Sequence, residues 1–402
     1  MMIPYGYKQT EVGVIPEDWE CVKIKDVATI SMCKRIFANQ TSTIGDVPFY
    51  KIGTFGKEAD AYISSKLYVE YRNKYSFPQK GDILISAAGT LGRTVVYDGE
   101  KAYFQDSNIV WLDINKTRLC NEYLNQYYKV IKWASSEGST IARLYNGIIY
   151  ATYISLPPLP EQQRIAEALS DVDGMISSLE KLIAKYKSIK TACLQQMFPQ
   201  NGETVPRMRL PGFTGAWEQR KLGELALFNP KDELPQTFEY VDLESVVGTE
   251  MLSHRTEAKS SAPSRAQRLA HTGDLFYQTV RPYQKNNYLF EKLDNNYVFS
   301  TGYAQMRPYV DGYFLLSLVQ SDRFVKVVLD NCTGTSYPAI NANDLAEIEV
   351  AAPSDENEAQ KIGTIFRNLD HLITLHQRKL EKVQKIKQGM MQQLLTGKIR
   401  VI

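Results

Sequence analysis

Residues 161–198 read EQQRIAEALSDVDGMISSLEKLIAKYKSIKTACLQQMF, and residues 358–395 read EAQKIGTIFRNLDHLITLHQRKLEKVQKIKQGMMQQLL. The two segments align without gaps at a constant offset of 197, and ten of their 38 positions are identical. The identities include Glu161/Glu358, Gln163/Gln360, Ile165/Ile362, Asp173/Asp370, Ile176/Ile373, Lys190/Lys387, Gln195/Gln392 and Gln196/Gln393. A repeat of this kind decides the architecture. The chain reads as a duplicated unit in the order variable region, helix, variable region, helix.

Both segments keep one apolar phase. Their apolar side chains recur at alternating spacings of four and three residues, which is the pattern of a coiled-coil seam. The seam residues are Ile165, Leu169, Val172, Ile176, Leu179, Ile183 and Tyr186 in the first copy, and Ile362, Phe366, Leu369, Ile373, His376, Leu380 and Val383 in the second. Prolines at 157, 158 and 160 mark a helix start. At about 1.5 Å per residue, 38 residues make a rod of about 57 Å.

A rod with an apolar seam needs a partner, and the nearest partner is the other copy. Because the second variable region lies between the copies, an antiparallel pairing lets the chain run out along one helix and return along the other. The alternative is two separate amphipathic helices, each packed on its own domain. The phase that the two copies share disfavours that alternative.

The regions between the helices consist of short β-like runs broken by turn formers, such as 82–86, 108–112, 297–299 and 348–350. Fainter echoes of the repeat extend into them, because the sequence Gly-Asp at 81–82 recurs at 273–274. The sequence therefore predicts an α+β fold, with two β-rich globular domains separated by two long antiparallel coiled-coil helices in a pseudo-twofold repeat. The predicted limits are 1–156 and 199–352 for the domains, and 157–198 and 353–402 for the helices.

Composition excludes several classes of protein. The 402 residues include 47 Lys plus Arg and 45 Asp plus Glu, with 44% hydrophobic residues, which fits neither a disordered nor a fibrous chain. No stretch approaches the roughly 18 to 20 apolar residues of a membrane span, and the start lacks the features of a secretory signal. The five cysteines are odd in number and never spaced as CxxC, which argues against disulfides and a zinc cage. We expect a cytoplasmic protein with reduced thiols.

Charge is uneven along the chain. Residues 21–156 carry 17 Lys/Arg and 12 Asp/Glu, a net charge of +5, whereas residues 221–350 carry 12 and 17, a net charge of −5. Residues 358–400 carry 9 and 3, a net charge of +6. A polyanion such as DNA would be attracted to the first domain and the second helix, and to the second domain only where basic residues cluster on one face.

Several polar and basic side chains in turns are candidate DNA contacts, because Arg, Lys, Gln, Asn and Tyr bind phosphates, read bases and stack. The candidates are Lys34, Arg35, Thr90, Arg93, Gln105 and Asn108 in the first domain, and Tyr277, Gln278, Arg281, Tyr283, Gln284 and Lys285 in the second. Each alone also fits a solvated loop residue. Two of the turns, 89–94 and 277–285, follow the matching Gly-Asp strands, so the duplication predicts equivalent places for them on two related domains.

Catalytic motifs are missing. The sequence contains no GxxxxGK[ST] loop, no GxGxxG opening a helix, no HExxH, no GxSxG and no Asn/Asp-Pro-Pro-aromatic tetrapeptide. The histidines, His254, His271, His371 and His376, do not cluster at ligand spacing. One pattern, Asp242 followed by Glu257-Ala258-Lys259, resembles the carboxylates and lysine of metal-dependent nucleases. The first copy offers no counterpart to it, so we expect no catalytic and no metal-binding residue.

This organisation resembles the specificity (S) subunit of Type I restriction-modification systems, over nearly the whole chain. The residues that carry the resemblance are LPPLPEQQRI at 156–165, IPEDW at 15–19, GFTGAW at 212–217 and QQLLTG at 392–397. The second lead-in, VAAPSDENEAQKI at 350–362, departs from the proline-rich form and is longer. The two junctions are therefore not expected to be identical.

The resemblance implies a DNA-binding subunit without catalysis of its own, in which each of two target-recognition domains reads half of a bipartite, asymmetric sequence in double-stranded DNA. It implies two modification (methyltransferase) subunits docked on the helices, which bind S-adenosylmethionine and methylate adenine N6. It also allows two restriction subunits that use ATP and Mg. Two other functions stay open at this point: a stand-alone enzyme, such as a metal-dependent nuclease or half-methyltransferase, and a protein-only adaptor.

Overall fold

The computed structural model describes residues 3–134, 143–200, 203–294, 296–334 and 336–401. It divides into two compact units: unit 1 is Met1–Ser178 with Leu380–Ile402, and unit 2 is Leu179–Lys379. Each unit therefore combines one β-rich domain with a part of both long helices, so the units cross the domain limits predicted from the sequence. No helix in the described part of the chain is long and apolar enough to span a membrane.

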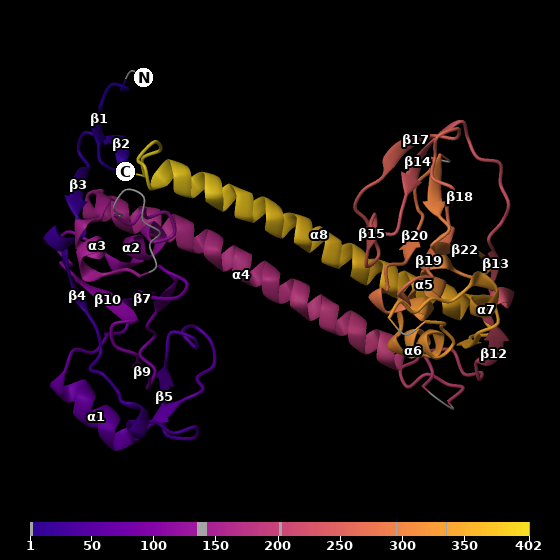
Figure 1. Ribbon diagram of the computed structural model, residues 1–402, viewed down its shortest axis with the longest axis horizontal. Helices are drawn as coiled ribbons and strands as arrows, with labels where there is room; N and C mark the ends of the chain where they lie inside the picture. The colour runs from indigo at the N-terminus through magenta and orange to yellow at the C-terminus, as the bar shows by residue number, and fades with distance from the viewer. Residues whose placement is uncertain (1–2, 135–142, 201–202, 295, 335, 402) are drawn as a thin grey trace. The chain divides into compact units, whose positions relative to one another are not determined.

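The long helices form where the repeat predicts them. Helix α4 spans Leu159–Gln196 and helix α8 spans Glu356–Leu394, each as one continuous ribbon (Figure 1). In unit 2 their contacts run antiparallel, because the ring of Tyr186 stacks on His376 while Lys190, further along α4, pairs with Asp370 at 2.5 Å. In unit 1, Asp173 pairs with Lys387 and, earlier in the chain, Glu161 pairs with Arg400. The helices therefore have the same antiparallel register in both units, and the segment that α4 contributes in one unit matches the segment that α8 contributes in the other.

All the seam side chains are buried or half-buried. The seam nevertheless serves two purposes. At the start of α4, Ile165 and Leu169 belong to the hydrophobic core of unit 1, and at the start of α8, Ile362 and Phe366 belong to that of unit 2. The first turns thus pack on the domain that precedes them in the chain, and the rest of the seam pairs the helices. The alternative of two helices packed only on their own domains is wrong.

Unit 1 is built on a four-stranded antiparallel sheet in the order β4-β10-β7-β8, with a two-stranded pair β3-β11 beside α4. Its strands and helices are β1 (Tyr7–Thr10), β2 (Gly13–Pro16), β3 (Glu20–Lys23), η1 (Ile24–Asp26), β4 (Ala28–Ser31), β7 (Ile83–Ser86), β8 (Thr94–Val96), β10 (Ile109–Ile114), α2 (Asn121–Tyr127), α3 (Asn146–Ala151) and β11 (Tyr153–Leu156). Trp19, Ile85 and Leu112 pack in the core of this sheet with Ile165 of α4.

A second, smaller layer of unit 1 contains an aromatic cluster. It consists of η2 (Ala38–Gln40), β5 (Val47–Tyr50), β6 (Tyr62–Ile63), α1 (Ser65–Lys74) and β9 (Tyr103–Phe104), with β5 parallel to β9. Figure 1 shows α1 beside β5. Tyr103 and Trp111 are fully buried here, between this layer and the main sheet.

Unit 2 repeats the main sheet of unit 1 strand for strand. Its order is β13-β22-β19-β20, and its pair β12-β23 matches β3-β11. These elements are β12 (Glu218–Lys221), η3 (Leu222–Glu224), β13 (Ala226–Phe228), β19 (Leu275–Gln278), η4 (Pro282–Gln284), β20 (Tyr288–Leu289), β22 (Tyr303–Pro308), α5 (Gly312–Gln320), α6 (Asp322–Asp330), α7 (Ala342–Ala346) and β23 (Glu349–Ala352). The predicted α+β fold with an internal repeat is confirmed.

The second layer differs between the units. In unit 2 it is a four-stranded sheet, β17-β14-β21-β18, with a small hairpin β15-β16. Its strands are β14 (Thr237–Val241), β15 (Val246–Val247), β16 (Glu250–Met251), β17 (Arg255–Ala258), β18 (Ala266–Leu269) and β21 (Tyr297–Ser300). Helix α1 has no counterpart among the described elements of unit 2, because strands occupy the chain between β14 and β19.

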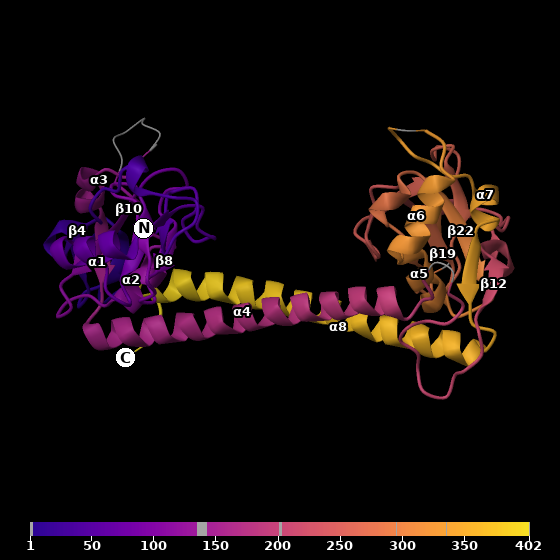
Figure 2. The same cartoon turned by 90° about the horizontal axis from the view of Figure 1, so that it is seen from below.

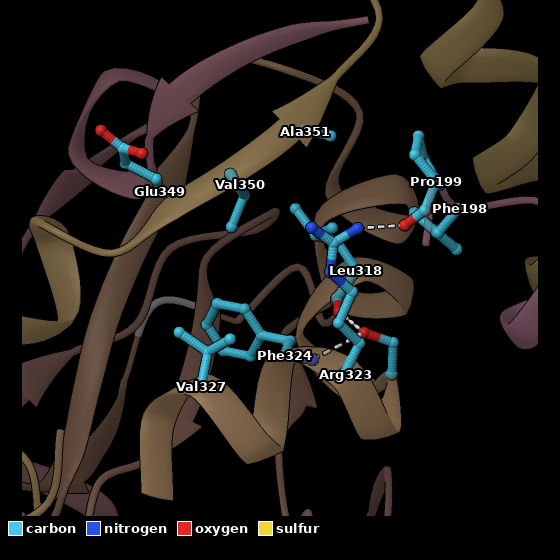
Figure 3. A pocket seen from close by; sticks show the side chains of 10 residues that line it. Phe198, Pro199, Leu318, Arg323, Phe324, Val327, Glu349, Val350 and Ala351 are labelled. Carbon is cyan, nitrogen blue, oxygen red and sulfur yellow. Dashed lines mark hydrogen bonds between the residues drawn. The ribbon is translucent and has the colours of Figure 1, made fainter. Parts of the chain in front are cut away.

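The segment that follows α4 is anchored to unit 2 by a small apolar pocket. Leu318, Phe324, Val327 and Val350 line it, as Figure 3 shows, and Phe198 closes one side. The guanidinium of Arg323 donates a hydrogen bond to the carbonyl of Pro199 at its rim. In Figure 2, α5 and α6 lie together beside β19 and β22, and buried side chains of these helices and strands share one hydrophobic core. This pocket therefore serves packing.

Candidate nucleic-acid interface

Loops from four places in the sequence meet at one part of unit 1. Gln105, after β9, accepts a hydrogen bond from the backbone N–H of Ile52, after β5, at 2.9 Å. Arg93, before β8, donates to the carbonyl of the same residue at 3.4 Å. Arg35, after β4, pairs with Asp106 at 2.8 Å. The structure thus brings Arg35, Arg93 and Gln105 together, although up to 70 positions separate them in the sequence.

These loops present donors and acceptors at different depths. Lys34, Arg35 and Thr90 are exposed, whereas Arg93 and Asn108 are half-buried. The guanidinium of Arg93 lies 5.3 Å from the ring centroid of Phe55, and its Nε has no hydrogen-bond partner among the described residues. That nitrogen is buried, so the guanidinium, fixed on an aromatic face, can offer only its terminal amino groups to a base edge or a phosphate oxygen.

In unit 2 the equivalent turn has an unusual backbone. Arg281 and Lys285, on either side of η4, have φ angles of 55° and 56°, in the left-handed region that non-glycine residues seldom occupy. The guanidinium of Arg281 lies 4.7 Å from the ring centroid of Tyr337, and Lys285 pairs with Asp322 at 2.5 Å. Backbone strain of this kind is concentrated at functional sites. Tyr283 and Gln284 between them are exposed.

Two of the candidate residues in unit 2 are not at the surface. Tyr277 is 0% exposed and Gln278 is 2% exposed, and burial raises the pKa of the Tyr277 phenol. Gln278 supports the turn instead, since its amide donates to the Val280 carbonyl and to Gln284. The sequence did not reveal this, because all four residues of β19 are buried and the strand lacks an alternating pattern.

The equivalence predicted for the two turns holds. The turn 89–94 lies between β7 and β8, the turn 277–285 leads from β19 towards β20, and these strand pairs occupy the same places in their sheets. Sequence reasoning missed two further polar groups at these turns. Arg143 donates to the carbonyl of Ser107 at 2.9 Å, and Tyr337 faces Arg281. Both come from distant parts of the chain and carry no local signal.

The nuclease-like pattern does not form a metal site. Arg255 pairs with Asp242 at 2.7 Å and with Glu257 at 2.8 Å, so one guanidinium occupies the place between the two carboxylates. Burial raises the pKa of Asp242, but hydrogen bonds from Arg255 and Ser245 outweigh it and hold the pKa below its usual value. Among the described residues, no three His, Cys, Asp or Glu side chains group in a way that could hold a metal ion.

The comparisons with known proteins identify the family. The model of the Type I restriction modification DNA specificity domain matches residues 16–189 and 257–385, most of the chain. The chain belongs to this family. A Haemophilus influenzae protein provisionally named as a type I restriction enzyme specificity subunit is 53% identical over 175 residues, which cover 44% of this chain and 46% of that protein. The MjaVIII specificity subunit of Methanocaldococcus jannaschii is 24% identical, and the match covers 98% and 96% of the two chains.

Solved structures agree on the fold of this specificity-domain family. The S subunit from M. genitalium aligns with a TM-score of 0.61 at 15% identity, covering 94% of this chain and 96% of that one. A second chain aligns with a TM-score of 0.51 at 17% identity. It comes from a structural study of complex assembly and conformational transition in the type I R-M system. The family, expected from the resemblance, and the fold, predicted from the repeat, are confirmed. The family assignment also confirms the prediction of a specificity subunit and not a catalytic subunit.

Proposed function

We propose that unit 1 and unit 2 each read one half of a bipartite, asymmetric DNA sequence, and that methylation subunits dock on α4 and α8. The observation that carries the proposal is the strand-for-strand repetition of the main sheet, with turns at equivalent places but different side chains in them. Two related readers with different contact residues suit two different half-sites. The length of α4, 38 residues or about 57 Å, suits a spacer between half-sites more than one DNA turn apart.

The test is methylation-sensitive long-read sequencing of DNA from cells that express this chain with and without its methylation subunit. We expect a split adenine motif only when both are present, with S-adenosylmethionine bound by the methylation subunit and ATP and Mg used by any restriction subunits. The five free cysteines suit action in the cytoplasm. If the assembled complex shows no salt-sensitive DNA affinity, the protein-only adaptor is the better function.

Single substitutions should alter one half-site each. We expect Arg93→Ala to relax discrimination in the half read by unit 1, by about 1–3 kcal/mol per base pair contacted, because its guanidinium can reach a base edge. Arg281→Ala is the matched change in unit 2 and should relax the other half. The motif methylated by each variant is the readout. A variant that alters both halves would contradict the modular assignment.

The docking of partners is supported by residues that are identical in both copies although packing does not require them. Ile189 and Ile386 are such a pair, 37% and 48% exposed. Lys185/Lys382 and Gln196/Gln393 are also identical and exposed. On a helix, Lys185, Ile189 and Gln196 lie within about 40° of one another, so they form one stripe. The same exposed apolar residue at the same place in both copies suits a binding surface that is present twice.

The neighbouring helix extends this stripe within each unit. Each of the two isoleucines immediately precedes a lysine at which the seam spacing continues, Lys190 or Lys387. Met175 of α4 and Leu372 of α8 likewise precede the seam residues Ile176 and Ile373. In an antiparallel pair, such residues lie on the same side. The register of the helices places Leu372 level with Ile189 in unit 2 and Met175 level with Ile386 in unit 1. Each unit therefore offers one copy of the same apolar ridge, which suits two identical methylation subunits.

Replacing these isoleucines should remove the partners one at a time. We expect Ile386→Asp or Ile189→Asp to weaken binding of one methylation subunit by about 2 kcal/mol or more, roughly 30-fold, because a carboxylate would be buried in an apolar contact. Multi-angle light scattering of the purified complex counts the subunits. Matched controls are Gln388→Asp and Ser188→Asp, which place the same charge on exposed positions near the ridge. Equal loss with the controls would contradict the assignment.

A further inference from the structure

Helix α1 of unit 1 holds exposed cations on aromatic rings. Lys34 Nζ lies 5.2 Å from the ring centroid of Tyr75, and Lys74 Nζ lies 5.6 Å from the same ring. The guanidinium of Arg72 lies 5.4 Å from the ring centroid of Phe77. We call Lys34, Arg72 and Lys74 the α1 patch. A cation over an aromatic face is held in place while keeping its full charge.

The α1 patch is not neutralised by carboxylates in the described structure. None of its three cations takes part in an ion pair found there, and Glu70, one turn before Lys74 on α1, forms none with it. At the other end of the helix, the carboxylate of Asp46 accepts a hydrogen bond from the N–H of Ser65. Three exposed charges of one sign therefore remain close together, which suits a polyanion.

The α1 patch adjoins the candidate reading loops. Lys34 and Arg35 are consecutive, and Lys34 faces α1 whereas Arg35 pairs with Asp106 beside Gln105. The hydroxyl of Tyr103, in the buried aromatic layer, donates to the carbonyl of Lys34 at 3.0 Å and fixes this junction. A duplex held against the loops by its base edges would thus have its phosphates available to the patch.

Unit 2 lacks this arrangement among its described residues. Strands replace α1 there, and the domain carries a net charge of −5. Several of its cations are paired: Arg255 with Asp242, and Arg307 with the buried Asp274 at 2.8 Å. Lys221 and Lys285 of this domain also pair with carboxylates, whereas no ion pair of the described structure involves a patch cation.

We propose that the α1 patch of unit 1 binds the phosphate backbone of duplex DNA beside the half-site that this unit reads, and that unit 2 has no equivalent phosphate-binding site among its described residues. The proposal rests on the proposed function, since it assumes that the chain binds DNA. The two units then contribute unequally to DNA affinity. Unit 1 supplies a larger part of the sequence-independent, salt-dependent affinity, and unit 2 depends on the complex to hold it on the DNA.

The experiment measures DNA affinity of the complete complex with its methylation subunits against salt concentration. Each phosphate contact contributes a slope of about −0.9 to the logarithm of affinity against the logarithm of salt. We expect the triple variant Lys34→Gln, Arg72→Gln, Lys74→Gln to reduce the slope by up to about 2.7, with the methylated sequence unchanged. The charge-preserving variant Lys34→Arg, Arg72→Lys, Lys74→Arg should keep the wild-type slope.

The matched control removes the same charge elsewhere on unit 1. Lys25→Gln, Lys116→Gln, Lys132→Gln changes three exposed lysines outside the patch and should alter the slope by less than one contact. Two results would contradict the proposal for the α1 patch and leave the proposed function standing. In the first, the wild-type complex binds DNA and the patch variant shows the same salt slope as the wild type. In the second, the patch variant and the control variant lose the same amount of slope. If the wild-type complex shows no salt-sensitive DNA binding, the proposed function fails. Should Arg72→Gln prevent folding, the double variant Lys34→Gln, Lys74→Gln replaces the triple, with an expected loss of up to about 1.8.

Discussion

Replacing Arg400 with alanine is expected to lower the free energy of unfolding of unit 1 by about 3–5 kcal/mol. Its guanidinium reaches the carboxylate of Glu161, at the start of α4, with Nε at 2.7 Å and Nη2 at 2.8 Å. Glu161 is only 5% exposed, so the substitution leaves a buried carboxylate with Trp19 Nε1 at 3.0 Å as its main remaining donor. Removing one partner of a buried pair costs far more than the pair contributes.

The effect should be confined to one unit, which amide hydrogen exchange can resolve. Arg400→Ala should lower protection in Met1–Ser178 and leave unit 2 unchanged. Arg209→Ala is the mirror experiment, because Arg209 pairs with the buried Glu358 at 2.8 and 2.7 Å, and it should act on unit 2. Lys398→Ala removes an exposed cation from the same tail as Arg400 and should change neither. Equal loss in both units would contradict the assignment.

The stability of the protein at acidic pH is a second measure of the contribution of Arg400. Its hydrogen bond and charge hold the pKa of Asp18 below the ordinary 3.8. A carboxylate with a lowered pKa in the folded state stabilises the protein above 3.8, and this contribution is lost as the pH falls through the lowered pKa. We expect urea unfolding to show this loss in the wild type below about pH 4. Arg400→Ala should lack that component.

The repeat predicted most of the fold because the periodicity of a helix can be recognised from residues that are close together in the sequence. Both long helices begin and end within two residues of the repeated segments, and the alternation of four and three runs through 165–186 and 362–383 inside them. The strand-for-strand match of the two sheets was visible only in short echoes such as Gly81-Asp82. The pair Glu161 and Arg400 could not be predicted, because 239 positions separate them and Arg400 lies outside the repeated segments.

The candidate interface was predicted by position and not by contact. Matching strands placed the turns of Arg93 and Arg281 correctly, because topology follows the repeat. Depth could not be predicted in the same way. Tyr277 has the right chemistry for stacking, but it lies in a strand covered on both faces. The partners that hold each guanidinium, Phe55 and Tyr337, come from loops that only the tertiary fold brings near.

Replacing Gly363 with alanine is expected to destabilise unit 2, although alanine favours a helix. An added Cβ at this position of α8 would collide with Oδ1 of Asp311 and lie 2.9 Å from the backbone nitrogen of Phe314. That carboxylate caps α5 by accepting a hydrogen bond from Phe314 N at 2.9 Å. Losing the cap costs about 1 kcal/mol and overpacking about 1–3 kcal/mol, while helix propensity returns about 0.5–1 kcal/mol. The net loss should be about 2 kcal/mol in urea unfolding.

Two other helical glycines are matched controls for the collision. Gly174 in α4 and Gly389 in α8 have no heavy atom within 4 Å of an added Cβ. Gly174→Ala and Gly389→Ala should therefore stabilise unit 1 by about 0.5–1 kcal/mol each, the full gain in helix propensity. Opposite signs for the same substitution would show that α8 approaches the start of α5 so closely that only glycine fits. A gain for Gly363→Ala equal to that of the controls would show that the two helices can move apart, and the close approach would then contribute nothing to the stability of unit 2.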